Sequence, residues 1–290
     1  MGERKVRYRD CDNFDKLGMP DKPDLWGWGD YYSTEKPLEQ LFIEVAKSSI
    51  QKSNLPVNEV DALFLCSANF SALQKSHANF IRHVLEETGV DDDTLVTGFT
   101  LDGCSSFLSA IVQAQASIVA GTHQNVLVIS ADYIQPHQLR FRPYALFSDG
   151  AAACLVTMAN QHHRIEIISS ASASRTSMMS DDAPYCEELA QIANNKALLT
   201  AGLNNEEIGK VFCGNLFLPL TILKESESGF DEEKIYTNNI QLKGHCFASD
   251  PIINLCDAME SEILMDREFV LLAADSPGIR TSIIARIREH

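Results

Sequence analysis

The chain has 290 residues, of which 45% are hydrophobic and 22% charged, a composition typical of folded soluble proteins. Its formal net charge of −16 argues against nucleic acid or an anionic membrane as a partner. No apolar run approaches the length needed to span a bilayer, so we expect a cytoplasmic protein that does not enter membranes. The eight cysteines show no metal-ligand spacing, and we interpret them as reduced thiols with no metal site.

Strand and helix patterns alternate along most of the chain. Residues 1–37 are polar, aromatic and rich in turn formers, and we expect an irregular amino-terminal arm there. Regular patterns begin at residue 38. They predict helices over 38–52, 79–87 and 107–120, and strands over 62–66, 95–101, 125–130, 154–157 and 165–168.

The same order of elements starts again in the second half of the chain. Asn58-Glu59 precedes Leu63-Phe64-Leu65-Cys66 at the same spacing at which Asn205-Glu206 precedes Lys210-Val211-Phe212-Cys213. Gly103-Cys104 is followed by a helix and then a strand. Gly244-His245 is followed in the same way by a helical stretch over 252–264 and a strand over 269–275. The chain is therefore a duplicated α/β unit with halves at 38–160 and 161–290. Alternating strands and helices predict mainly parallel sheets that are covered on both faces.

Cys104 is the candidate nucleophile. It stands where an apolar strand gives way to a helix, and the unpaired N–H groups and positive dipole of a helix start favour a thiolate. The alternative is a small buried cysteine that only fills space. If the halves pack about a pseudo-dyad, Cys104 and His245 occupy equivalent positions at one central site. The repeat therefore predicts a cysteine nucleophile beside a histidine base.

Three segments carry a resemblance to a known family. They are Gly103-Cys104-Ser105-Ser106-Phe107, Phe147-Ser148-Asp149-Gly150-Ala151-Ala152-Ala153 and Leu271-Leu272-Ala273-Ala274-Asp275-Ser276-Pro277-Gly278. In this order and spacing, residues 38–290 resemble the thiolase-like condensing enzymes, most closely the β-ketoacyl-ACP synthase III and chalcone synthase branch. The resemblance implies a five-layered αβαβα sandwich. It also implies a dimer formed through the central sheets, as a homodimer or as a heterodimer with a related subunit.

The chain departs from the family pattern in three places. The family's His-Gln-Ala-Asn segment falls on Phe212-Cys213-Gly214-Asn215, so its histidine is absent while Asn215 remains. The family's Gly-Asn-Thr/Met-Ser element falls on Gly244-His245-Cys246-Phe247, where histidine replaces asparagine. The amino end is too short for the usual first strand and hairpin.

The resemblance implies an acyl-cysteine intermediate on Cys104, with His245 and Asn215 as further catalytic residues. For Asn215, an ordinary loop asparagine is the alternative. The oxyanion of the tetrahedral intermediate would be bound by the Cys104 N–H and by the Ser276-Pro277-Gly278 turn. Because Pro277 has no N–H, Gly278 is the candidate in that turn.

The resemblance implies no bound cofactor; an acyl-CoA or acyl-ACP thioester is the substrate. Trp26 lies about where the family stacks a tryptophan on the CoA adenine, and Arg140 or Arg142 about where an arginine completes the clamp. Trp26 as a packing anchor of the arm is the alternative. The region that docks a carrier protein reads Lys224-Glu225-Ser226-Glu227 and Asp231-Glu232-Glu233. Acidic residues there would repel an acidic carrier, so we expect a CoA ester or an atypical carrier.

These residues predict an acyl-thioester-dependent acyltransferase or a ketosynthase III-like condensing enzyme, in secondary-metabolite or fatty-acid-derived biosynthesis. The competing hypothesis is a non-catalytic or half-catalytic partner subunit of a heteromeric condensing enzyme. The missing histidine and the short amino end favour it, whereas Cys104 and Gly244-His245 count against it. A degradative thiolase is less well supported, because the turn from Asp275 to Gly278 lacks the second cysteine that thiolases use.

Overall fold

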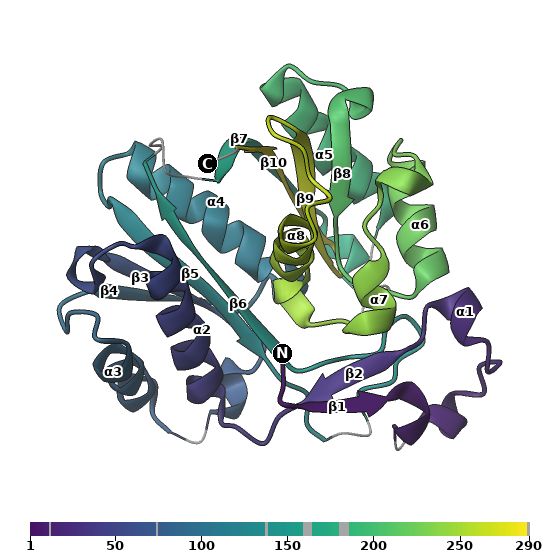
Figure 1. Ribbon diagram of the computed structural model, residues 1–290, viewed down its shortest axis with the longest axis horizontal. Coiled ribbons are helices and arrows are strands. Elements are labelled where there is room, and N and C mark those ends of the chain that lie inside the picture. Colours follow the sequence, from purple (N-terminus) through teal and green to yellow (C-terminus); the bar gives the residue numbers. More distant parts are fainter. Residues whose placement is uncertain (12, 74, 137–138, 159–163, 180–185, 289–290) are drawn as a thin grey trace.

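Two four-stranded sheets with helices between and outside them form the body of the molecule (Figure 1). The computed structural model describes residues 1–11, 13–73, 75–136, 139–158, 164–179 and 186–288. No helix in the described part of the chain combines the length and the apolarity required to cross a membrane.

The first sheet has the strand order β4-β3-β5-β6. β3 (Ala62–Cys66) is parallel to β4 (Leu95–Phe99) and to β5 (Asn125–Asp132), and β6 (Gly150–Thr157) is antiparallel to β5. All residues of β3 and nearly all of β5 are buried. These two strands are therefore covered on both faces, which explains why they read as unbroken apolar runs.

The second sheet has the strand order β7-β10-β9-β8. β8 (Ile208–Phe212) is parallel to β9 (Phe269–Ser276), whereas β10 (Ile279–Ile287) is antiparallel to both β9 and β7 (Ile165–Ser174). The parallel β3–β5 pair of the first sheet thus has its counterpart in the parallel β8–β9 pair. These are the strands that the sequence repeat matches.

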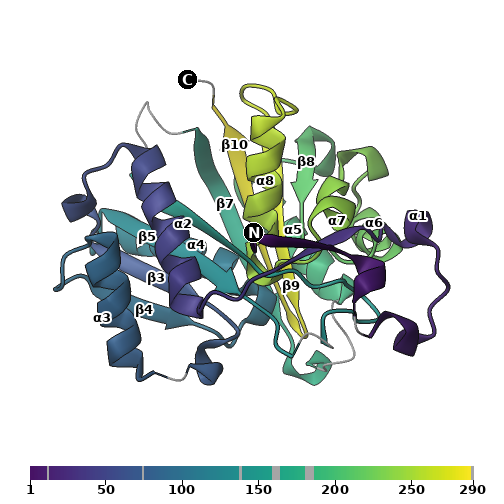
Figure 2. The ribbon, with the colours of Figure 1, turned by 60° about the horizontal axis from the view of Figure 1, so that its bottom comes forward.

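Helices complete five layers, which Figure 2 shows from a second direction. α2 (Leu38–Ser53) and α3 (His77–Thr88) pack on the outer face of the first sheet. α4 (Ser106–Val119) and α8 (Asp250–Glu260) lie between the sheets, and α5 (Glu187–Ala201) covers the outer face of the second. α6 (Leu218–Glu227) and the short α7 (Asn238–Leu242) follow β8. The predicted α/β sandwich with duplicated units is confirmed.

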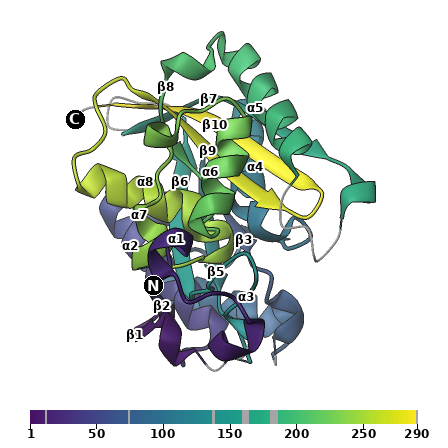
Figure 3. The same ribbon diagram turned by 90° about the vertical axis from the view of Figure 1, so that its right-hand side faces the viewer.

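The amino-terminal arm differs from the prediction. Instead of an irregular segment, it contains an antiparallel pair, β1 (Arg4–Arg7) and β2 (Asp30–Ser33), and a short helix, α1 (Pro23–Trp26). Figure 3 shows it alongside α7 and the first half. Its aromatic side chains pack on Phe141 and Phe217 from the two halves. Hydrophobic burial orders this arm, and the spacing of its aromatic residues matches neither a helix nor a strand, so the sequence pattern did not reveal it.

Candidate active site

Cys104 is held where the two halves meet. It lies in the 3₁₀ turn Gly103–Ser105 between the end of β4 and the start of α4. Gly103 has a φ of +52°, and a Cβ there would lie 2.6 Å from Ser276 Oγ, so only glycine lets the turn pack against the end of β9. Ser105 Oγ donates a 2.9 Å hydrogen bond to the Ala274 carbonyl. The thiol itself is partly exposed.

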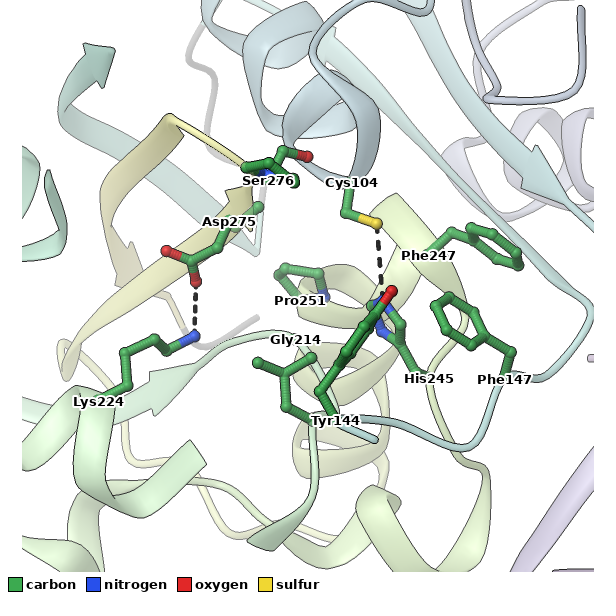
Figure 4. Close-up of a pocket in the computed structure, with 13 residues that line it drawn as sticks. Cys104, Tyr144, Phe147, Gly214, Lys224, His245, Phe247, Pro251, Asp275 and Ser276 are labelled. Atoms are coloured by element: carbon green, nitrogen blue, oxygen red, sulfur yellow. Dashed lines mark hydrogen bonds and ion pairs between the residues drawn. The ribbon is translucent and has the colours of Figure 1, made fainter. Parts of the chain in front are cut away.

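The backbone of His245 is held by Leu146 and Ser148, which come shortly before β6. Its N–H donates to the Leu146 carbonyl (2.8 Å), and its carbonyl accepts from the Ser148 N–H (2.9 Å). The imidazole packs on the Phe147 ring, with the ring centroids 4.8 Å apart. Its Nε2 lies 3.6 Å from Cys104 Sγ, a contact that is drawn as a dashed line in Figure 4. The structure therefore brings together the cysteine and the histidine that the sequence repeat paired.

Asp250, the first residue of α8, completes a triad that the sequence analysis missed. His245 Nδ1 lies 2.5 Å from Asp250 Oδ2. The carboxylate also accepts the N–H groups of Cys246 and Asn215, each at 2.7 Å, and it is fully buried. One signal was present in the sequence: an acidic residue followed by Pro251 marks a helix start just after His245. Nothing in that pattern pointed the carboxylate at the imidazole.

The triad makes His245 a strong base for proton transfer. Burial works against a charged imidazole, but the Asp250 carboxylate and Cys104 outweigh it and raise the pKa of His245 to about 10. At neutral pH the ring is therefore an imidazolium, which donates to Asp250 through Nδ1 and faces Cys104 through Nε2.

This raised pKa predicts how stability depends on pH. A histidine with a pKa near 6.5 in the unfolded chain and about 10 in the folded one stabilises the fold fully below pH 6.5. That contribution is lost as the pH rises through 10. We expect the difference in unfolding free energy between the wild type and His245→Gln to shrink from pH 6 to pH 10, as measured by denaturant titration. A difference that stays constant over this range would contradict the imidazolium.

Asn215 does not line the cavity beside Cys104; its side chain supports Asp250 instead. Its Nδ2 donates to the Gly244 carbonyl (2.9 Å) and to Asp250 Oδ1 (3.2 Å), and its Oδ1 accepts from Asn254 (2.9 Å). The predicted catalytic role is therefore corrected to a positioning role, because the amide is already used within the protein. Cys213 cannot replace the missing histidine either, since burial raises the pKa of its thiol to about 12.

The cavity at Cys104 has a volume of about 70 Å³ and two chemically different walls. The rings of Phe147 and Phe247 lie on one side of the Cys104–His245 pair in Figure 4, and Asp275 and Lys224 lie on the other. Phe247 has a φ of +53°, a strained conformation for a bulky residue, and its ring is 4.9 Å from that of Phe147.

The polar wall belongs to a buried charge cluster, which we define as Lys224, Glu225, Asp275 and Arg280. Lys224 Nζ lies 2.5 Å from Asp275, and Arg280 binds Glu225 through two 3.0 Å hydrogen bonds and Asp275 at 2.7 Å. The two cations outweigh burial and lower the pKa of both carboxyl groups. The interpretation of Lys224 and Glu225 as carrier-facing surface residues was wrong, because both side chains are fully buried.

Gly278 does not line the cavity. It lies in the β9–β10 turn with a φ of +73°, and a Cβ there would come within 2.8 Å of the Arg175 carbonyl and 2.5 Å of Met179. Its own carbonyl accepts the Arg175 N–H at 2.8 Å. The predicted oxyanion donor therefore faces the segment that follows β7, and Pro277 and Ser276 face the cavity instead.

The predicted CoA clamp is only partly compatible with the structure. Trp26 is half-buried, stacks on Trp28 with the ring centroids 5.9 Å apart, and donates from Nε1 to the Pro20 carbonyl. Arg140 is excluded, because it is fully buried and holds Asp149 with hydrogen bonds of 2.8 and 2.7 Å. Arg142 is half-buried, and like Trp26 it lies outside the cavity lining at Cys104.

In the described ranges of the chain, no group of three or more His, Cys, Asp or Glu side chains is placed to hold a metal ion. Cys104, His245 and Asp250 form a chain of contacts at 3.6 and 2.5 Å, an arrangement of the kind that nucleophilic catalysis uses.

Comparisons with known proteins agree with this fold. The family model for 3-oxoacyl-[acyl-carrier-protein (ACP)] synthase III matches residues 100–175, which include Cys104. A β-ketoacyl-[acyl-carrier-protein] synthase III from Solibacter usitatus is 28% identical over 128 residues, a match that covers 42% of this chain and 36% of that protein. One from Listeria welshimeri is 23% identical over 257 residues, covering 82% of this chain and 80% of that protein.

A solved structure extends the likeness over nearly the whole chain. The acyltransferase ChlB3 superimposes with a TM-score of 0.83 at 16% identity, over 98% of this chain and 94% of that one. The family model matches the segment around Cys104, and the Listeria welshimeri protein aligns with 82% of the chain. The ChlB3 structure matches the fold over 98% of the chain. The chain is thus similar in sequence to β-ketoacyl-[acyl-carrier-protein] synthases III, and it shares its fold with ChlB3.

Proposed function

We propose that this protein transfers an acyl group from a thioester to a second substrate through an acyl-cysteine on Cys104. One observation carries the proposal: Cys104, His245 and Asp250 stand in line at 3.6 and 2.5 Å, and Cys104 and His245 line a common cavity. The relatives' names, which include an acyl-carrier-protein synthase and an acyltransferase, agree with thioester chemistry.

The first half-reaction forms the acyl-enzyme. The Cys104 thiolate attacks the thioester carbonyl carbon, and the carbonyl electron pair moves to its oxygen. When the tetrahedral intermediate collapses, the bond to the departing sulfur breaks. The His245 imidazolium gives its Nε2 proton to that thiolate, so the products are a free thiol, an acyl-Cys104 and a neutral imidazole.

The second half-reaction uses the neutral imidazole as a base. Cys104 contributes to the raised pKa of His245, and acylation removes the charge on that sulfur. His245 is then ready to take a proton from the acceptor as it attacks the acyl-Cys104 carbonyl. Expulsion of the Cys104 thiolate restores the starting state. Asp250 holds Nδ1 throughout and stabilises the imidazolium each time it forms.

Acyl transfer to a hydroxyl, amine or thiol acceptor is better supported than decarboxylative condensation. In the family that the chain resembles, decarboxylation of a malonyl unit uses two polar side chains. Among the described residues that line the cavity, His245 is the one imidazole, and Gly214 offers no side chain in the segment that lost its histidine. Cys213, in the same segment, is buried in the core.

The donor and the assembly form the finer part of this proposal. A free CoA ester is the donor, because the exposed residues Asp231, Glu232 and Glu233 disfavour an acidic carrier protein. The adenine of the CoA binds near Trp26 and Arg142. The protein works in the cytoplasm as a dimer, in specialised or fatty-acid-derived biosynthesis. If it instead assists an active homologue as a partner subunit, it will form no acyl adduct of its own.

We expect a burst of one equivalent of free CoA per chain when the enzyme meets a suitable acyl-CoA without an acceptor. The burst is measured by chromatography over a panel of acetyl, malonyl and medium-chain esters. Cys104→Ala should show none, because the nucleophile is gone, whereas Cys256→Ala, which removes an exposed thiol on α8, should keep the burst. An equal burst from Cys104→Ala, or no burst from the wild type with any ester, would reject the proposal.

A further inference from the structure

Ser276, the last residue of β9, lies against the turn that holds the nucleophile. Its Oγ lies 2.6 Å from the position that a Cβ on Gly103 would occupy, directly before Cys104. The residue is 6% exposed, and its Oγ is buried with no hydrogen-bond partner among the residues that the structure describes. Ser276 nevertheless lines the same cavity as Cys104 and His245 (Figure 4).

A buried hydroxyl without a partner costs folding free energy, so its presence at a reactive site calls for a physical reason. Attack on a thioester develops negative charge on the carbonyl oxygen, and enzymes bind that oxygen with fixed N–H or O–H donors. Pro277, which lines the cavity, has no N–H to offer, and Gly278 does not line the cavity. The Ser276 hydroxyl is an O–H donor from a residue on this wall.

Asp275 is the neighbouring candidate, and its chemistry excludes it. One of its carboxylate oxygens also lacks a partner in the described part of the chain. Arg280 and Lys224 lower the pKa of this carboxyl against the effect of burial, so it is ionised and can only accept hydrogen bonds. An oxyanion needs a donor. The same two cations, 2.7 and 2.5 Å away, balance the Asp275 charge that would otherwise oppose an oxyanion.

We infer that the Ser276 hydroxyl donates to the carbonyl oxygen of the acyl thioester and to the oxyanion that forms there. The inference rests on the proposed function and adds a catalytic residue to it. As Cys104 Sγ bonds to the carbonyl carbon, the π pair moves to the oxygen that Ser276 holds. The pair returns when the departing thiolate leaves, and Ser276 keeps its proton throughout.

The test is the rate of Cys104 acylation in a single turnover with an acyl-CoA that gives a burst with the wild type. Ser276→Ala should acylate about 100-fold more slowly, the size of loss that follows removal of one oxyanion donor. Alkylation of Cys104 by iodoacetamide, which forms no oxyanion, should proceed at the wild-type rate. Ser106→Ala is the matched control: Ser106 is also a buried serine whose hydroxyl has no described partner, but it does not line the cavity.

The outcomes separate this inference from the function on which it rests. Slow acylation with normal alkylation in Ser276→Ala, and normal rates in Ser106→Ala, support the hydroxyl as oxyanion donor. Equal acylation by the wild type and Ser276→Ala overturns the inference and leaves the acyl-cysteine intact. A parallel loss of alkylation overturns it too, because the defect then lies in the thiolate. If the wild type is not acylated at all, the proposed function fails first.

Discussion

Asp250→Asn is expected to lower kcat/KM for acyl transfer by about 10³–10⁴-fold, the size of loss that this change causes in a Ser–His–Asp triad. An amide keeps an oxygen that can accept from Cys246 or Asn215, so the start of α8 should remain in place. It removes the charge that stabilises the His245 imidazolium. The asparagine NH₂ group could also take the place of the carboxylate oxygen that lies 2.5 Å from His245 Nδ1. It would then donate to Nδ1 and select the wrong tautomer of His245.

The pH profile separates this positioning role from a merely structural one. Because Asp250 raises the pKa of His245, the limb of the rate profile that reports the imidazolium should move to lower pH in Asp250→Asn. Asp257→Asn is the matched control, since Asp257 is a carboxylate on the same helix that pairs with Lys243. It should leave both the rate and the profile unchanged. An unshifted profile in Asp250→Asn would remove Asp250 from the triad.

Lys224→Met is expected to lower the free energy of unfolding by about 3–5 kcal/mol, as breaking a buried ion pair does. Lys224 and Asp275 are almost completely buried, and Lys224 Nζ lies 2.5 Å from the Asp275 carboxylate. Methionine would fill the volume of the lysine but leave two buried negative charges, on Asp275 and Glu225, facing the single positive charge of Arg280. Denaturant titration at neutral pH measures the loss. The contribution of a surface lysine pair is no more than about 1 kcal/mol.

A double variant supplies the control for this prediction. Lys224→Met combined with Asp275→Leu leaves Arg280 and Glu225 as a complete pair with two 3.0 Å hydrogen bonds. We therefore expect the double variant to be more stable than Lys224→Met alone, with a non-additive free energy that reports the coupling. If Lys224→Met alone were as stable as the wild type, the buried ion pair between Lys224 and Asp275 would not stabilise the fold.

The sequence repeat was enough to predict the two principal site residues. Cys104 and His245 are 141 positions apart, and their pairing follows from equivalent places in the two halves, not from local spacing. The alternation of strands and helices likewise predicted sheets covered on both faces, but the sheets are mixed instead of mainly parallel, because β6, β7 and β10 pair antiparallel. β10 was not predicted, although it follows directly on the turn after β9.

The remaining errors share one cause: a sequence pattern does not reveal where a polar side chain points. Lys224-Glu225 reads as a charged surface, yet α6 turns both side chains toward Asp275 and Arg280. Asp250 contacts His245 across a turn of five residues, and Ser276 contacts the distant Gly103; no periodicity encodes either contact. Gly278 was chosen for its N–H, but its position is set by packing against Met179.

The most direct test of the account is to locate the acyl group after the wild type reacts briefly with an acyl-CoA. Trypsin cleavage after Arg82 and Arg140 releases a peptide, residues 83–140, in which Cys104 is the one cysteine. The account predicts that peptide mass spectrometry finds the acyl mass on this peptide, and that the label is lost in His245→Gln. Label on another cysteine peptide, or equal labelling of residues 83–140 in His245→Gln, would contradict a Cys104 nucleophile activated by His245.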